Sequence, residues 1–195
     1  MSEQRLQQQL NFLMEIDQLK QVERQTAITG GSRRENTAEH SWHLAMFALI
    51  LAEHANESVD LFHVLSLCLV HDIVEIDAGD APIHGDHDPA EQDAKEIAAA
   101  NRIFGLLPDD QRDEFRSLWE EFEAAESADA RFAKALDRLQ PIFLNHLGRG
   151  GTWTDYDVDE SRVREKTQRI AAGSSVLWST AEQIFADAVN QGWLK

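Results

Sequence analysis

Two neighbouring ionisable residues, His71 and Asp72, lie inside a long apolar stretch of the sequence. Burying an imidazole and a carboxylate costs several kcal/mol unless a partner or a metal ion compensates. A shared divalent cation would provide that compensation. Glu75 follows within one helical turn and is therefore expected on the same helical face. Asp80 comes directly after Gly79, where the helix is expected to end.

Two further segments carry side chains that can bind a metal. His40 stands at the start of an apolar helical pattern, and Asp137 is a lone acid within another. Taken alone, His40 would more often be a capping or core residue, and ordinary surface charge is the less favoured alternative for Asp137 beside Arg138. The pair His71-Asp72 has its own alternative, a buried ion pair at a helix end. Together these residues favour one shared site, which the fold must assemble because the segments are far apart in the chain.

This ordered set of motifs resembles the metal-dependent phosphohydrolases of the HD-domain superfamily, and most of all the branch that contains the 5′-deoxynucleotidases. A His-Asp dipeptide alone is a weak signal, whereas the ordered set is specific. The matching pieces extend over roughly residues 15 to 147 and follow the family's order: Glu39-His40-Ser41, His71-Asp72-x-x-Glu75 with Gly79-Asp80, and Ala135-Leu136-Asp137-Arg138.

The resemblance implies that His40, His71, Asp72 and Asp137 bind one divalent cation. Two imidazoles and two carboxylates suit a transition metal with open positions for water and phosphate. They are too rich in nitrogen for a typical calcium site. Mn, Fe, Co, Ni, Zn and Mg are not separable on this ligand set.

Other histidines raise the alternative of a second metal ion. His43 lies one turn beyond His40, and we favour a structural role for it beside the site. His84 and His87 belong to a polar loop with several helix breakers, and we interpret them as part of the rim of the site.

Catalytic roles follow from the same resemblance. A divalent cation polarises a phosphoryl oxygen and lowers the pKa of water, which provides a nucleophile near neutral pH. Glu75 is predicted to orient that water or to carry its proton. Asp80 is predicted either to assist the leaving group or to hold the sugar, and the sequence does not choose between the two roles.

Positive charge for the phosphate is predicted to come from Arg24, in a segment that resembles the family's arginine-bearing turn. Arg33 and Arg34 are the alternatives. The chain departs from the family here, because its nucleotidases carry tryptophan after this arginine and this chain carries Gln25. Selection against ribose that depends on that aromatic residue is therefore not expected.

Composition limits the partners. The formal net charge of −17 argues against binding a nucleic-acid polymer, which needs clustered Lys and Arg. No apolar run approaches the roughly 20 residues that span a bilayer, and the N-terminus lacks a signal-peptide hydrophobic region. The single cysteine, Cys68, is interpreted as core filler. We therefore expect a cytoplasmic protein without nucleic-acid or membrane partners.

The hydrophobic pattern is helical almost throughout and contains no convincing strand. We predict an all-α protein, a single compact HD domain over residues 1–195 that forms a bundle of about six to seven helices. The metal-site core is expected over about residues 20–147, and residues 26–34 are expected to form a loop. Helices are predicted over about residues 3–22, 37–52, 60–78, 89–104, 108–125, from 129 past Pro141, and 159–191.

These observations predict a metal-dependent hydrolase of a small phosphomonoester, with nucleoside 5′-monophosphates as the leading class. A sugar phosphate or a nucleotide polyphosphate is the nearest alternative, and extra phosphates would need more cations than the chain offers. A non-catalytic, metal-stabilised binding module is the other alternative. It would need neither Glu75 nor Asp80, so their joint presence favours an enzyme. A homodimer is expected from the resemblance and from the amphipathic C-terminal segment.

Overall fold

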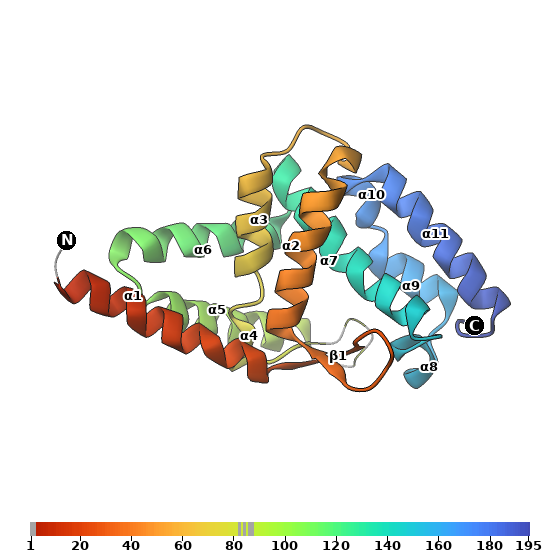
Figure 1. The fold of residues 1–195 in the computed structure, drawn as a ribbon, viewed down its shortest axis with the longest axis horizontal. Coiled ribbons are helices and arrows are strands. Elements are labelled where there is room, and N and C mark those ends of the chain that lie inside the picture. The colour runs from red at the N-terminus through yellow and green to blue at the C-terminus, as the bar shows by residue number, and fades with distance from the viewer. Residues whose placement is uncertain (1–2, 82, 84, 86–87) are drawn as a thin grey trace.

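The computed structural model describes residues 3–81, 83, 85 and 88–195, so His84 and His87 lie outside the described residues. Helices make up most of this chain, which confirms the all-α prediction (Figure 1). The elements in order are α1 Glu3–Glu15, the 3₁₀ helix η1 Ile16–Gln21, β1 Glu23–Ala27, β2 Arg34–Asn36, α2 Thr37–Leu51, η2 Ala52–His54, α3 Leu61–Val70, α4 Glu75–Ala78, α5 Pro89–Phe104, α6 Asp109–Ala124, α7 Ala128–Leu147, α8 Thr152–Asp155, α9 Glu160–Thr167, α10 Ile170–Gly173 and α11 Ser175–Asn190.

Local capping chemistry places several of these helix ends. The Asn36 side chain accepts a hydrogen bond from the backbone N–H of Glu39, whose own side chain accepts from the Asn36 backbone, so the predicted capping box is confirmed. The Asp88 side chain caps α5 by accepting a hydrogen bond from the backbone N–H of Ala90, with Pro89 in the first turn as expected. The helix α7 continues through Pro141 to Leu147, also as predicted.

The prediction that the chain has no strand is wrong. β1 and β2 pair antiparallel, with Glu23 opposite Asn36 and Ala27 opposite Arg34. Three residues of β1 therefore face the single residue Glu35, which is the geometry of a bulge. Strands this short, one of them bulged, show no regular alternation of apolar and polar residues, so the sequence pattern could not indicate them.

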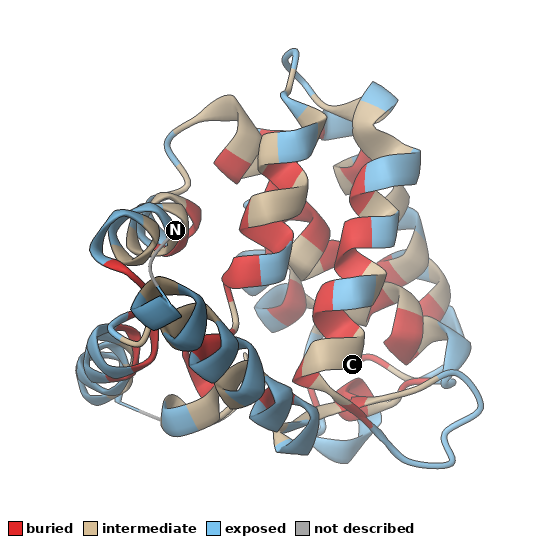
Figure 2. Ribbon diagram, turned by 60° about the vertical axis from the view of Figure 1, so that its left-hand side comes forward, coloured by how far each residue is buried: buried red, intermediate tan, exposed pale blue. Residues whose placement is uncertain are grey.

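Two hydrophobic clusters hold the helices together. The larger cluster joins α2, α3, α7 and α11. The smaller cluster joins α1, α5 and part of α6 with the segment that follows α3. In Figure 1, α2, α3 and α7 occupy the middle of the molecule, with α1, α5 and α6 on one side and α9–α11 on the other. Figure 2 shows the buried residues concentrated on the inward sides of these helices. Among the described helices, none has the length and apolarity needed to span a bilayer.

The prediction of a single C-terminal helix over residues 159–191 is wrong, because the structure has three helices there, α9, α10 and α11. The divide lies where Gly173 packs closely on α7. A Cβ atom at Gly173 would stand 2.7 Å from the Cβ of Ala135 and 2.8 Å from the backbone carbon of Arg131. Ser174 is then extended, and its side chain caps α11 by accepting from the N–H of Leu177.

Gly173→Ala is therefore expected to destabilise the fold, because the added methyl group meets backbone that cannot move without shifting α7. Overpacking of this kind typically costs about 1–3 kcal/mol. For a chain of this size, that corresponds to a melting temperature lower by roughly 2–12 °C. Thermal denaturation followed by circular dichroism measures it, with Ala172→Ser at the exposed neighbouring position as the control. A variant that melts at the wild-type temperature would contradict the close-packing argument.

Candidate active site

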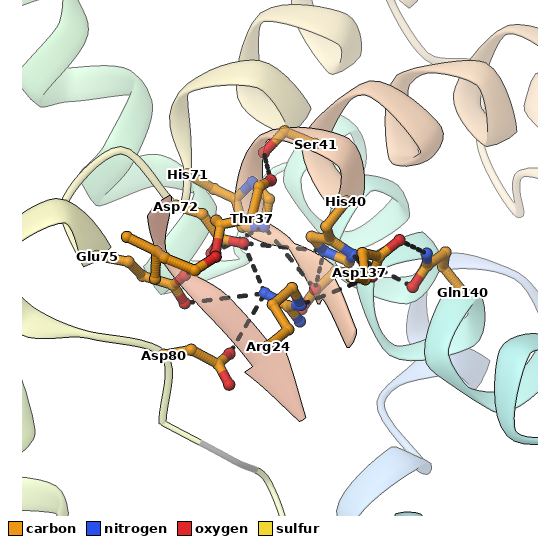
Figure 3. Close-up of polar contacts among 12 residues, drawn as sticks. Arg24, Thr37, His40, Ser41, His71, Asp72, Glu75, Asp80, Asp137 and Gln140 are labelled. Carbon is orange, nitrogen blue, oxygen red and sulfur yellow. Dashed lines mark hydrogen bonds and ion pairs between the residues drawn. The ribbon is translucent and has the colours of Figure 1, made fainter. Parts of the chain in front are cut away.

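Side chains from three parts of the fold converge at the centre of the molecule (Figure 3). His40 comes from α2, Asp137 from α7, and His71 with Asp72 from the turn after α3. One nitrogen or oxygen from each of His40, His71 and Asp72 lies within 4.8 Å of the other two. The Oδ1 atom of Asp137 lies 3.2 Å from Nε2 of His40 and 3.8 Å from Nε2 of His71. The fold thus brings all four predicted ligands together.

The turn after α3 explains how two adjacent residues reach one site. We predicted one helix over residues 60–78, and this is wrong, because α3 ends at Val70 and α4 begins at Glu75. Within the turn, Ile73 N–H donates to the Val70 carbonyl and Glu75 N–H donates to the Asp72 carbonyl, at 3.2 and 3.0 Å. These i→i+3 hydrogen bonds end the α-helical path at the site and re-aim the chain toward α4. Nε2 of His71 and Oδ1 of Asp72 lie 3.0 Å apart at this helix end.

The hydrogen bonds of the two histidines suit metal binding. Nδ1 of His71 lies 2.9 Å from the Cys68 carbonyl, and Nδ1 of His40 lies 3.2 Å from Oε1 of Gln140. Both acceptors require a proton on Nδ1, so each Nε2 presents a lone pair to the centre when its imidazole is neutral, as it is when it binds a metal ion. Nε2 of His71 is buried and has no hydrogen-bond partner among the described residues. A buried nitrogen that accepts no hydrogen bond and lies next to two carboxylates is suited to binding a cation.

Electrostatics lead to the same conclusion. Burial by itself lowers the pKa of His71, but the Asp72 and Asp137 carboxylates outweigh burial and raise this pKa to about 10. Burial likewise opposes ionisation of Asp137, yet hydrogen bonds from His40 and His71 hold its pKa well below the ordinary value. The carboxylates thus attract positive charge strongly, whether it arrives as protons on the imidazoles or as a metal ion.

Glu75 is a buried carboxyl group directly beside these residues. Its Oε2 atom accepts a hydrogen bond of 2.8 Å from the Thr37 hydroxyl, and its Oε1 atom lies 3.8 Å from Nη1 of Arg24. Burial raises the pKa of Glu75 well above its ordinary value, and the charge of Asp72 adds to the effect. A carboxyl group with a raised pKa can both accept and return a proton.

Asp80 reaches the site because the chain reverses at Gly79. This glycine ends α4 with a φ of 75°, a conformation that a residue with a Cβ adopts only with strain. Oδ1 of Asp80 then lies 3.5 Å from Nη1 of Arg24. Burial raises the pKa of Asp80, although the charge of Arg24 opposes the shift. Asp80 is therefore a second carboxyl group that can hold a proton at this site.

Arg24 is the arginine that reaches the site. Its Nη1 atom donates to Oδ2 of Asp72 at 2.9 Å, and its side chain is only 13% exposed. Arg33 instead forms an ion pair of 2.6 Å with Glu39, and Arg34 donates to Gln25. Of the three arginines that the sequence offered as candidates, Arg24 alone lies among the predicted site residues.

Two residues that were not predicted, Gln140 and Glu35, hold a predicted ligand in place. Gln140 bonds His40 through Oε1, and its Nε2 atom donates to Oε1 of Glu35 at 2.8 Å. The same Nε2 atom lies 3.2 Å from Nδ1 of His43, which places His43 beside the site. Gln140 could have been found, because it follows Asp137 by three residues and so shares its helical face. Glu35 carried no such signal, since it faces the bulge of an unpredicted strand.

A pocket of about 680 Å³, partly open to solvent, adjoins the convergent side chains. Arg24, Asp80 and Asp137 line it, so the predicted phosphate-binding arginine, one predicted catalytic carboxyl group and one predicted metal ligand lie at its wall. The bulge of β1 contributes to this arrangement, because the consecutive residues Arg24, Gln25 and Thr26 all line the same space. The pocket continues past Arg138 toward α8 and α9. There is thus room beside the site for the organic part of a substrate.

Known proteins with similar sequences are named 5′-deoxynucleotidases. The 5′-deoxynucleotidase HDDC2 of Homo sapiens is 33% identical over 134 residues, which are 68% of this chain and 64% of that protein. The 5′-deoxynucleotidase YfbR of Salmonella arizonae is 30% identical over 148 residues, which are 67% of this chain and 74% of that protein. The matched segment therefore spans somewhat less than two thirds of the human relative.

A solved structure and a family model extend the likeness to almost the whole chain. The crystal structure of a predicted metal-dependent phosphohydrolase from Magnetospirillum magnetotacticum superposes with a TM-score of 0.94 at 51% identity, covering 98% of this chain and 96% of that one. The family model of the HD domain matches residues 16–178. The chain therefore belongs to the HD-domain family.

Proposed function

We propose that this protein is a divalent-metal-dependent phosphohydrolase of small phosphomonoesters, and that nucleoside 5′-monophosphates are its leading substrate class. The observation that carries the proposal is the placement of Glu75, Asp80 and Arg24 around a candidate cation site at the wall of a pocket. The names of the relatives support the nucleotidase assignment. A single domain over residues 1–195, a homodimer and a cytoplasmic location stay predictions.

His40, His71, Asp72 and Asp137 would hold the cation, with both histidines fixed through Nδ1 so that Nε2 faces inward. Asp137 as the fourth ligand is part of this proposal. A divalent cation supplies charge stabilisation for the phosphoryl oxygens and acidifies water. A typical mononuclear site of this kind leaves open positions for substrate and water.

The chain's own side chains then divide the remaining work. Arg24 binds a non-bridging phosphate oxygen, exchanging part of its present contact with Asp72 for one with substrate. Glu75, oriented by the Thr37 hydroxyl, takes a proton from the attacking water as its oxygen bonds to phosphorus. The ester P–O bond breaks, and Asp80, whose raised pKa lets it hold a proton, donates that proton to the leaving alkoxide. Glu75 then releases its proton to solvent and Asp80 takes one up from solvent, which restores the starting state. The products are inorganic phosphate and an alcohol.

The rival assignments explain fewer of these features. A metal-stabilised binding module would not need two buried carboxyl groups beyond the ligands, since each costs free energy to bury. A polyphosphate substrate would need additional cations. Among the described residues that line the pocket, arginine occurs only at Arg24 and Arg138, and lysine does not occur.

Substrate selectivity provides the direct test. Because Gln25 replaces an aromatic residue after Arg24, we expect hydrolysis of both dAMP and AMP, with a preference for the deoxyribose substrate under about tenfold. A pocket that merely accommodates a hydroxyl group discriminates weakly, whereas one built to reject or require it discriminates strongly. Paired kcat/KM measurements on the two nucleotides, in a screen with several metals and sugar phosphates, decide the question.

Two outcomes of that screen would change the assignment. A preference of about a thousandfold would show that residues other than residue 25 build a strict sugar filter. Absence of activity on both nucleotides, together with activity on a sugar phosphate, would replace the nucleotide by another phosphate ester.

A further inference from the structure

An aromatic side chain that the proposed mechanism does not use lines the pocket beside the candidate active site. Two aromatic rings, those of Trp153 and Tyr156, belong to the described lining. Trp153 is only 1% exposed and packs within the larger hydrophobic cluster. Tyr156 is 40% exposed and lines the pocket, so part of this residue is open to a ligand there. Of the two aromatic residues in the described lining, Tyr156 is therefore the more accessible one.

Hydrogen bonds fix the position of this ring relative to the phosphate end of the pocket. The Tyr156 hydroxyl donates to Oε1 of Gln25 at 2.9 Å, across 131 positions of sequence. Arg34 donates to the same oxygen, so both of its lone pairs are engaged. Gln25 adjoins Arg24 in β1. One peptide unit thus connects the residue that holds the ring to the arginine proposed to bind phosphate.

The other side of Tyr156 is anchored just as firmly. Tyr156 follows α8, whose first residue, Thr152, is buried and hydrogen-bonded to Asn145 of α7 through both its backbone N–H and its hydroxyl group. Thr152 N–H donates to Oδ1 of Asn145 at 3.0 Å, and Nδ2 of Asn145 donates to the Thr152 hydroxyl at 2.9 Å. Gly151 makes this contact possible, because a Cβ atom there would stand 3.3 Å from the Asn145 backbone and would clash with its side chain. α7 also carries Asp137, so the ring and a proposed metal ligand are tied to the same helix.

We infer that Tyr156, positioned by Gln25, is the specificity-determining side chain for the leaving group, and that it recognises the planar base of a nucleoside by stacking. This inference rests on the proposed function, because it takes the phosphate end of the substrate to lie at Arg24 and Asp137. A tyrosine ring held at a fixed position binds a planar group at little cost in conformational entropy. An acyclic or sugar leaving group gains much less from the ring face.

The test compares dAMP with ribose 5-phosphate, a sugar 5-phosphate that carries no base. For Tyr156→Ala, we expect kcat/KM on dAMP to fall about ten- to hundredfold, mainly through a higher KM, as is typical when a base loses its stacking partner. On ribose 5-phosphate the same variant should stay within about twofold of wild type. Tyr156→Phe loses the bond to Gln25 but keeps the ring. Because the ring face provides the stacking, this variant should retain most of the nucleotide activity.

Matched variants separate stacking from folding. Phe62→Ala truncates an aromatic residue that is 80% exposed and lies outside the pocket lining, and it should leave both substrates unaffected. Tyr156→Leu keeps bulk without a ring face, so it tests the inference even where Tyr156→Ala melts early. An equal loss on both substrates, or no loss on dAMP in either non-aromatic variant, would overturn the role of Tyr156 while nucleotide hydrolysis by the wild type stands.

A binding measurement keeps the inference testable where the proposed function fails. If the wild type hydrolyses ribose 5-phosphate but not dAMP, calorimetric titration of deoxyadenosine into the wild type and into Tyr156→Leu decides the matter. Binding that weakens about tenfold or more in the variant supports the aromatic recognition of a nucleoside. Equal binding to both proteins, or binding to neither, overturns it.

Discussion

Asp72→Ala is expected to abolish stoichiometric binding of a divalent cation and, with it, phosphohydrolase activity. The carboxylate of Asp72 lies against Nε2 of His71 and takes part in the group that can hold a metal ion. Removing it deletes an anionic ligand and leaves Arg24, which it now neutralises at 2.9 Å, beside the cation position. Both changes weaken cation binding. Elemental analysis of the purified variant against the wild type measures the loss.

The chain offers a close control for that experiment. Asp77 follows Asp72 by five residues but pairs with Arg102 outside the site, so Asp77→Ala should retain its cation. Melting temperatures of both variants show whether the fold survives. Full cation occupancy in Asp72→Ala would contradict the assignment of Asp72 as a ligand.

The second large effect is expected for Glu75→Gln, which should lower turnover by roughly 10²-fold or more while the cation content hardly changes. Glutamine has the same shape, and its amide oxygen can still accept the hydrogen bond from the Thr37 hydroxyl. It cannot take a proton from water. The loss should therefore appear in kcat rather than KM, because binding of the phosphate does not depend on the basic carboxylate. Steady-state kinetics combined with elemental analysis of the same preparation provides both readouts.

A variant on the same short helix controls for local disturbance. Asp77→Asn neutralises a carboxylate two residues beyond Glu75 without touching the site, and its kcat should stay close to wild type. Should Glu75→Gln lose its cation together with its activity, Glu75 would be a ligand and the division of roles proposed above would be wrong.

The convergent side chains could be anticipated because each belongs to a segment with its own local signal. His40 follows a capping box, His71 and Asp72 interrupt an apolar helix, and Asp137 sits in a helical pattern. Local chemistry of this kind acts over a few residues and can be read from the sequence. The order of the motifs then linked them to one family, which the family model confirms.

Features that depend on distant partners could not be anticipated. The helix break at Gly173 reflects contact with Arg131 and Ala135, and the bond between Tyr156 and Gln25 joins residues 131 positions apart. Neither contact has a local sequence pattern. Glu35 shows the same limit, because it becomes a site residue only through Gln140, 105 positions away. Packing of α7 decides all of these arrangements except the bond to Gln25.

The two hydrophobic clusters meet at the end of α3, where Cys68 belongs to the larger cluster and Val70 to the smaller one. The helices that carry His40 and Asp137 are anchored in the larger cluster, whereas Glu75 begins α4, which packs on α5 of the smaller cluster. Proteins open locally in cooperative units that need not include the whole fold. Opening of the smaller cluster would withdraw Glu75 while the helices bearing His40 and Asp137 stay folded. It would also loosen His71 and Asp72, which lie between Val70 and Ile73 of that cluster. Inactivation by partial unfolding is thus expected to coincide with loss of the cation, and the stability of the smaller cluster sets the limit for both.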